Sequence, residues 1–191
     1  MGFLDVITGK RKLKSAAPTD RVFAMSTAAV TLELELGLKS TGKAGIVFQP
    51  LATADFDGIV RDMEEVVRGT GEETGTTVTS KDDAFGYRWL VVEDPDMEDL
   101  VVAINACSTA LEAGGYGDRI LAAVFAFGDE KGKPVYWIYN YKRGAFYPFV
   151  PSGGAQQRDN ERELRLKAQI GRELPVEAEL ERWFPLWGAP I

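Results

Sequence analysis

The sequence contains no histidine among its 191 residues. Histidine is the base in Ser-His-Asp and Cys-His catalysis and a ligand in HExxH metal sites and in zinc fingers, so all of these sites are excluded. A single cysteine, Cys107, excludes an intrachain disulfide, as is common in proteins of reducing compartments. Because Cys107 lies in an apolar stretch with a helical pattern, we interpret it as a small core residue.

Long apolar runs and an excess of positive charge are also missing. No run approaches the ~18 apolar residues of a membrane-spanning helix, and the N-terminus lacks the apolar core of a secretory signal. The net charge of −7 excludes a general binder of nucleic acid or of anionic membranes. We therefore expect a cytoplasmic protein that makes at most a weak peripheral contact with the inner face of the membrane.

Residues 1–17 depart from this acidic balance. Four basic residues there outweigh one acid, which gives the segment a net charge of +3 and leaves −10 for the rest of the chain. One interpretation is a short helix followed by a solvated linker, and the other is a weak, reversible contact with anionic lipid or with an acidic partner. The contact residues would be Lys10, Arg11, Lys12 and Lys14.

Apolar periodicity in the rest of the chain predicts alternating strands and helices. The middle of the chain has the order β-α-β-β-α-β-β, which indicates a mainly antiparallel sheet with helices packed on it. We predict a single α+β domain over residues 18–191, in which residues 154–191 form a helical C-terminal extension. Strands are expected at 44–49, 77–80, 87–93, 120–127 and in the hairpin 135–151, and helices at 55–68, 97–113, 159–174 and from Pro175 onward.

Residues 22–38 fit two patterns. Apolar residues alternate from Val30 to Leu38, as in a strand, but they also recur at helical spacing from Val22 onward. We favour a helix that ends at Gly37 and keep a strand as the alternative.

Two motifs resemble ligand sites without meeting their requirements. Residues 37–44 nearly spell the phosphate loop G-x-x-x-x-G-K-[ST], but Ala44 replaces the hydroxyl that binds magnesium, so we predict a Gly-rich turn at 40–42 instead. The acidic run 93–99 lacks the spacing of an EF-hand, and carboxylates at a helix start are favoured as caps. We expect no metal, cofactor or catalytic residue.

The strongest local pattern is the stretch 135–151, which holds seven aromatic residues. β-Branched and aromatic residues on both sides of the turn Lys142-Arg143-Gly144 predict a β-hairpin. Its likeness to an RNA-binding strand fails, because Pro148 interrupts the second strand and the chain is acidic. About half of the rings should only cover the core, and the others should form a protein-binding patch around an arginine. The expected contact residues are Tyr139, Tyr141, Lys142, Arg143, Phe146, Tyr147, Arg158, Trp183 and Trp187.

Six segments together resemble the PspA-associated protein family, PspAB. They are residues 1–5, 41–45, 85–89, 139–149, 158–161 and 181–188, and the strongest is 139–149, YNYKRGAFYPF. The resemblance implies a link to PspA, the peripheral membrane protein of the phage-shock response to envelope stress, and an association with a membrane protease of the HtpX type. It implies no activity, cofactor or catalytic residue.

Three functional hypotheses follow. The first is a non-enzymatic adaptor of the PspA response that acts by protein–protein contact. The second is a small-ligand-binding domain or an enzyme, with an anion site lined by Tyr139, Tyr141, Arg143 and Arg158. The third is a chaperone-like adaptor that binds peptides, which an exposed apolar groove would favour. The sequence leaves the oligomeric state open.

Overall fold

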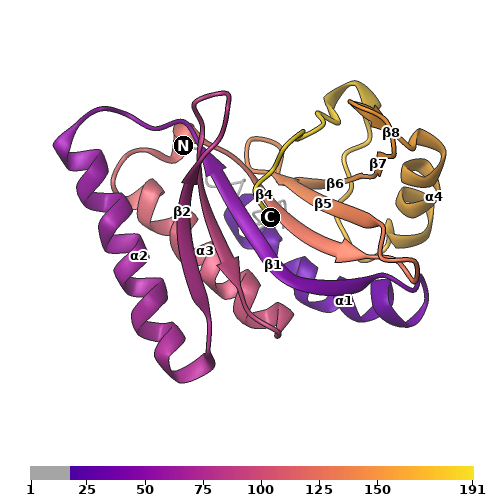
Figure 1. Cartoon of the computed structure of the whole chain (residues 1–191), viewed down its shortest axis with the longest axis horizontal. Coiled ribbons are helices and arrows are strands. Elements are labelled where there is room, and N and C mark those ends of the chain that lie inside the picture. Colours follow the sequence, from indigo (N-terminus) through magenta and orange to yellow (C-terminus); the bar gives the residue numbers. More distant parts are fainter. Residues whose placement is uncertain (1–17) are drawn as a thin grey trace, which may run out of the picture.

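The computed structural model describes residues 18–191 and is organised around one antiparallel sheet. Within those residues the sheet has six strands in the order β2-β3-β1-β4-β5-β6 (Figure 1). The strands are β1 Lys39–Phe48, β2 Thr77–Asp82, β3 Arg88–Glu93, β4 Ile120–Gly128, β5 Pro134–Asn140 and β6 Ala145–Phe149. A separate short hairpin is formed by β7 Pro151–Ser152 and β8 Gln157–Arg158.

The helices connect these strands in the predicted order. The α-helices are α1 Ala24–Leu34, α2 Ala54–Thr74, α3 Met97–Ala113 and α4 Asn160–Ile170, and the 3-10 turns are η2 Pro18–Phe23, η3 Gly117–Arg119 and η4 Leu180–Arg182. The part β1-α2-β2-β3-α3-β4 has the connectivity of a split β-α-β unit. Strands β5 and β6 widen this unit at the β4 edge, which confirms the predicted α+β class and the aromatic hairpin.

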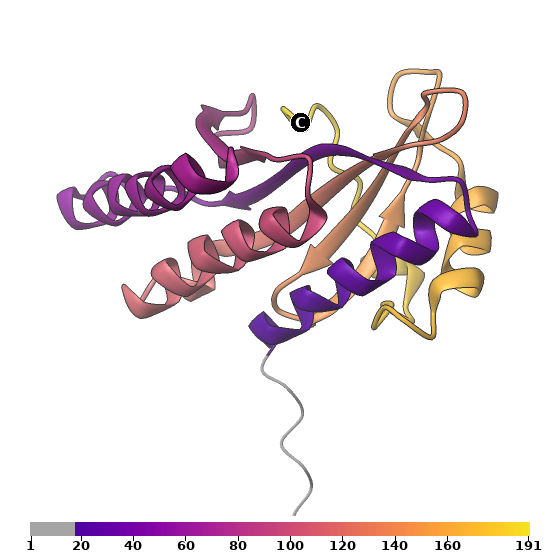
Figure 2. The ribbon, with the colours of Figure 1, turned by 90° about the horizontal axis from the view of Figure 1, so that it is seen from below.

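One face of the sheet is covered by helices. Figure 2 shows α1, α2 and α3 lying along that face, and α4 packs beside β6 and α1. The core between helices and sheet includes Phe48 of β1, Phe125 of β4 and Tyr139 of β5, all fully buried. Burial of large apolar side chains, each contributing roughly 1.5–3 kcal/mol, drives this packing.

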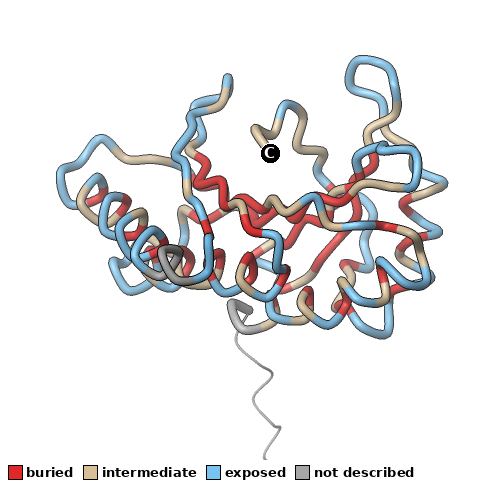
Figure 3. The backbone as a smooth tube through the Cα atoms, turned by 60° about the horizontal axis from the view of Figure 1, so that its bottom comes forward, coloured by how far each residue is buried: buried red, intermediate tan, exposed pale blue. Residues whose placement is uncertain are grey.

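The opposite face of the sheet is also apolar. Because side chains alternate along a strand, Leu90 points to the helices and Val91 to the other face, and Ala123 and Val124 divide in the same way. In Figure 3 the buried strands form a band with the helices on one side and the C-terminus on the other. We call residues 183–191, which cover this second face, the C-terminal strap.

The first strand begins earlier than predicted. The turn expected at residues 40–42 is wrong, because these residues form an irregularity inside β1, where the pairing with β4 shifts between Ser40 and Lys43. Gly42 has φ 74°, and Thr41 donates its hydroxyl to the Ala126 carbonyl at 3.1 Å. The near-match to a phosphate loop therefore lies within a strand.

Two further boundaries differ from the expectations. The end of the helix expected at 55–68 is wrong, because α2 continues to Thr74; glycine weakens a helix by about 1 kcal/mol but does not forbid it. The last helix expected from Pro175 is wrong as well. The N–H of Phe146 donates to the carbonyl of Pro175, and the N–H of Glu177 donates to Phe146, so this segment is held extended against β6.

Three expected helices are confirmed. Residues 22–38 contain helix α1 rather than a strand, and the N–H of Leu38 donates to the carbonyl of Leu32 after Gly37, at φ 64°, has turned the chain. Helix α3 has the predicted bounds. Helix α4 begins after Asp159, whose side chain accepts from the N–H of Arg162, and it ends at Ile170 rather than at the predicted residue 174. Asp96 and Asp159, which cap α3 and α4, are of a residue type favoured at helix starts, whereas α1 begins without a side-chain cap.

Replacement of Gly42 and of Gly58 by alanine should have opposite effects on stability. Gly42→Ala should lower the free energy of unfolding by about 1–2 kcal/mol, because φ is positive and the new Cβ would lie 3.1 Å from the Asp94 carbonyl oxygen. Gly58→Ala, inside α2 with nothing within 4 Å of the new Cβ, should raise it by about 0.5–1 kcal/mol. Urea unfolding measures both, and an unchanged Gly42→Ala variant would contradict the role of the irregularity.

Candidate functional site

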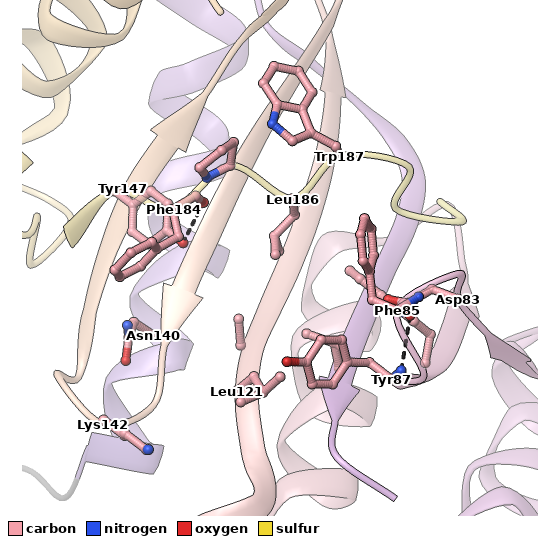
Figure 4. A pocket seen from close by; sticks show the side chains of 14 residues that line it. Asp83, Phe85, Tyr87, Leu121, Asn140, Lys142, Tyr147, Phe184, Leu186 and Trp187 are labelled. Atoms are coloured by element: carbon pink, nitrogen blue, oxygen red, sulfur yellow. Dashed lines mark hydrogen bonds between the residues drawn. The ribbon is translucent and has the colours of Figure 1, made fainter. Parts of the chain in front are cut away.

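The strap leaves part of the second face uncovered. An apolar groove of about 380 Å³ lies there, with strands β1, β3 and β4 as its floor (Figure 4). Its floor residues are apolar, and they are Val47, Trp89, Leu121 and Ala122. An open apolar groove on a protein surface is the usual form of a ligand or partner site.

Aromatic rings stand on both walls of the groove. Phe85 and Tyr87 come from the β2–β3 loop, and Tyr147, Phe184 and Trp187 come from β6 and the strap (Figure 4). Phe85 is 70% exposed and Phe184 60% exposed. Exposed aromatic rings around an apolar floor are typical of the central part of protein–protein interfaces.

The β2–β3 loop is held in shape by Asp83. Its carboxylate accepts hydrogen bonds from the backbone N–H groups of Phe85 at 2.8 Å and Tyr87 at 3.0 Å, and from the Trp89 indole N–H at 3.0 Å. Burial works to raise the pKa of Asp83, but these donors outweigh it and lower the pKa. The exposed Phe85 ring is therefore presented by a loop with fixed backbone.

The strap is anchored at its first residues. The Trp183 indole N–H donates to the Glu177 carbonyl at 3.2 Å, and its ring stacks on Tyr147 with centroids 6.1 Å apart. The Tyr147 hydroxyl donates to the Phe184 carbonyl at 3.0 Å, and Arg158 donates to the Trp183 carbonyl at 2.7 Å. The Phe184 side chain remains outside these contacts, on the wall of the groove.

Two ion pairs hold the residues on which the strap is anchored. Arg158 pairs with the buried Glu163 at 2.8 Å, and Glu163 also accepts from the N–H of Val150. Burial raises the pKa of Glu163 despite these donors. Arg143 pairs with the buried Glu177 at 3.0 Å. Both arginines therefore have structural partners inside the molecule.

The structure corrects the expected contact surface. Tyr139, Tyr141 and Phe146 are buried against the helices, and Tyr147 is buried on the other face, where Trp183 of the strap packs on it. The reason is that successive side chains of a strand point to opposite faces of the sheet, and both faces of this hairpin are covered by an apolar core. The expected residues that reach the groove are Tyr147, Trp187 and the exposed Lys142. Lys10, Arg11, Lys12 and Lys14 lie outside the described residues.

The alternative anion site is not assembled. Tyr139 and Tyr141 lie in the helix-side core, whereas Arg143 and Arg158 are engaged with Glu177 and Glu163.

Burial raises the pKa of the Cys107 thiol to about 12, so this thiol is not a nucleophile near neutral pH.

Sequence reasoning missed most of the groove. Phe85 lies in the polar stretch between the strands expected at 77–80 and 87–93, and an aromatic residue in such a turn is a signal of exposure. Leu121 and Phe184 carry no local signal, because the groove exists only where β4 and the strap meet in space. Trp89 was assigned correctly to a strand, but its face could not be assigned.

The acidic run serves the fold. Asp94 accepts from the Thr76 hydroxyl at 2.6 Å, and Asp96 caps α3 by accepting from the N–H of Glu98 at 2.7 Å. The part of the chain that the structure describes holds no cluster of three or more histidine, cysteine or carboxylate side chains suited to a metal ion.

The helices of the described region are too short or too polar to cross a bilayer. Within residues 18–191, none combines the length and the apolarity that a membrane span requires.

Comparison with known proteins gives one family. The family model described as PspAB, PspA associated protein B, matches residues 1–191, which is the whole chain. No curated protein and no solved structure matches the chain. The matched range includes the β2–β3 loop, the hairpin and the strap, and therefore every residue that lines the groove.

The Arg143–Glu177 pair should make stability depend on pH. Burial works to raise the pKa of Glu177, but the N–H of Glu179 and the Arg143 guanidinium outweigh it and lower the pKa from its ordinary 4.5. Such a carboxylate stabilises the fold above its ordinary pKa, and this contribution is lost as the pH falls through the lowered pKa. Arg143→Gln should thus cost at least about 1 kcal/mol near neutral pH and less at about pH 3.

Chemical unfolding at the two pH values measures this difference. Lys142→Gln is the matched control, because the neighbouring Lys142 has no ion pair with any other residue in the range 18–191 and should change stability little. An equal loss for Arg143→Gln at both pH values would contradict the coupling to Glu177.

Proposed function

The chain belongs to the PspA associated protein B family, and from this premise we propose that it is a non-enzymatic accessory protein that binds a partner protein in the groove. The resemblance seen in the sequence is confirmed by the family match. The family name indicates an association with PspA, and this family is not a known enzyme family. The proposed partner is accordingly a PspA-type protein of the same organism.

The observation that carries the proposal is the pair of exposed rings on the two walls of an apolar groove. Phe85 stands on the wall formed by the β2–β3 loop and Phe184 on the wall formed by the strap, and the apolar side chains of Leu186 and Leu121 lie in the space between these walls (Figure 4). An apolar segment of the partner that entered the groove would remove both rings from water, at roughly 1.5–3 kcal/mol for each fully buried side chain. A few such anchors supply most of the affinity of ordinary protein interfaces.

The groove also supports the chaperone-like alternative. An adaptor of that kind would hold exposed apolar peptides from many proteins, and the same floor and walls would serve it. The two proposed functions differ in how selectively the groove should bind its partner. A dedicated PspA adaptor should bind PspA much more tightly than it binds an unfolded chain such as reduced casein, whereas a chaperone-like adaptor should bind both.

Leu121→Glu should separate the groove from the rest of the surface. The new carboxylate would lie on the apolar floor, and co-purified PspA should fall by at least about 10-fold, which corresponds to about 1.4 kcal/mol. Val102→Glu is the matched control, since Val102 is 50% exposed on α3, on the helix-covered face. Pull-down from cells that express PspA measures both variants.

The controls make the result decisive. Both variants should unfold in one cooperative urea transition, with a midpoint near that of the parent for Val102→Glu and a lower one for Leu121→Glu, because Leu121 packs partly on the second-face core. Recovery of PspA is compared at a temperature at which circular dichroism shows both variants to be folded. Unchanged PspA recovery with Leu121→Glu would remove the groove from the proposal, and loss with Val102→Glu alone would assign binding to the helical face.

We also propose a role for the basic N-terminal segment. Lys10, Arg11, Lys12 and Lys14 would add a weak contact with anionic lipid, so that the protein works in the cytoplasm at the inner face of the membrane. Sedimentation with phosphatidylglycerol vesicles should lose most of its bound fraction when residues 1–17 are deleted. Equal sedimentation of both forms would contradict the contact. A membrane protease of the HtpX type is a proposed second partner.

A further inference from the structure

One end of the groove differs chemically from the rest. Lys142 and Asn140 lie together there, away from Phe85 and Asp83 on the opposite wall (Figure 4). Lys142 is exposed, and its ammonium makes no ion pair with another side chain of the described domain. The neighbouring Arg143 is held by Glu177, so Lys142 is the cation of the turn that remains available to a ligand.

Asn140 adds an incomplete hydrogen-bonding group at the same end. Its Oδ1 is buried and has no hydrogen-bond partner among the residues that the structure describes. The last torsion of an asparagine side chain is broad and roughly two-fold, so a rotation of about 180° exchanges the oxygen and the nitrogen that face the groove. A side-chain amide beside a lysine can thus bind a carboxylate and the peptide group next to it.

The opposite wall carries the reverse charge. Asp83 is ionised, and its oxygens already accept from three N–H donors, so it offers a bound carboxylate only repulsion. A segment with one acidic end therefore has a single favourable direction in the groove, with its acid at Lys142. The strap shows which other residues this face accepts, because Leu186 and Trp187 of the chain itself already pack on it.

We propose that the groove selects an extended apolar peptide segment that carries an acidic residue at one end, bound by Lys142 and Asn140. This proposal rests on the proposed function, and it adds the chemistry of the partner segment. Charge complementarity over this short distance acts as a specificity determinant, because the described domain as a whole is acidic and does not attract anions from afar.

The test uses two labelled peptides that differ only at the last residue. Their sequences are acetyl-Leu-Phe-Pro-Leu-Trp-Glu-amide and the same peptide ending in Gln, and their affinities for the full chain are measured by fluorescence anisotropy. The Glu peptide should bind about 5–10-fold more tightly, in line with a partly exposed charge-assisted hydrogen bond. Raising the salt concentration should reduce this difference.

Variants of the protein complete a double-mutant cycle. Lys142→Gln should weaken the Glu peptide to the affinity of the Gln peptide and leave the Gln peptide unchanged. Lys131→Gln is the matched control, because Lys131 lies in the β4–β5 turn and does not line the groove. It should preserve the preference for Glu.

The outcomes distinguish this inference from the function on which it rests. Equal binding of both peptides to the parent, with loss of both in Leu121→Glu, overturns charge recognition and leaves the groove as the partner site. Unchanged binding in Leu121→Glu overturns the groove itself. Binding of palmitate but of neither peptide also overturns the proposal, in favour of a lipid carboxylate.

Discussion

The architecture depends on a sheet that is apolar on both faces while helices cover only one. The helices of the described region pack on one face of the sheet, and the second face is covered by the extended strap. Trp183, Leu186, Trp187 and Ile191 of the strap pack on that face, and a space stays open between the strap and the β2–β3 loop. The groove is what remains, and its apolar floor follows from the same alternation that built the sheet.

The aromatic hairpin contributes rings to both apolar cores. Tyr139 and Phe146 point to the helices, with centroids 4.6 Å apart, while Tyr147 and Phe149 point to the strap and contact its tryptophans. Arg143 extends this role, because it pairs with Glu177 at the start of the segment that leads to the strap. The rings of the hairpin therefore support the groove from within the two cores, and only Tyr147 among them lines it.

Local chemistry explains what could be predicted from the sequence. The bounds of α3 follow from Asp96 and from the double glycine after Ala113, and β4 follows from its uninterrupted apolar run. The irregularity at Gly42 and the bridge from Val176 to Phe146 could not be predicted, because both depend on partners far away in the sequence. The groove could not be predicted for the same reason, because Phe85, Leu121 and Phe184 come to line one cavity only in the folded chain.

Amide hydrogen exchange with and without bound PspA locates the contact without any substitution. Binding in the groove should slow exchange in the β2–β3 loop around Phe85 and in the strap around Phe184, with the exposed faces of α2 and α3 unchanged. Slower exchange confined to the helices, or no change in the loop and strap while PspA is bound, would contradict binding in the groove.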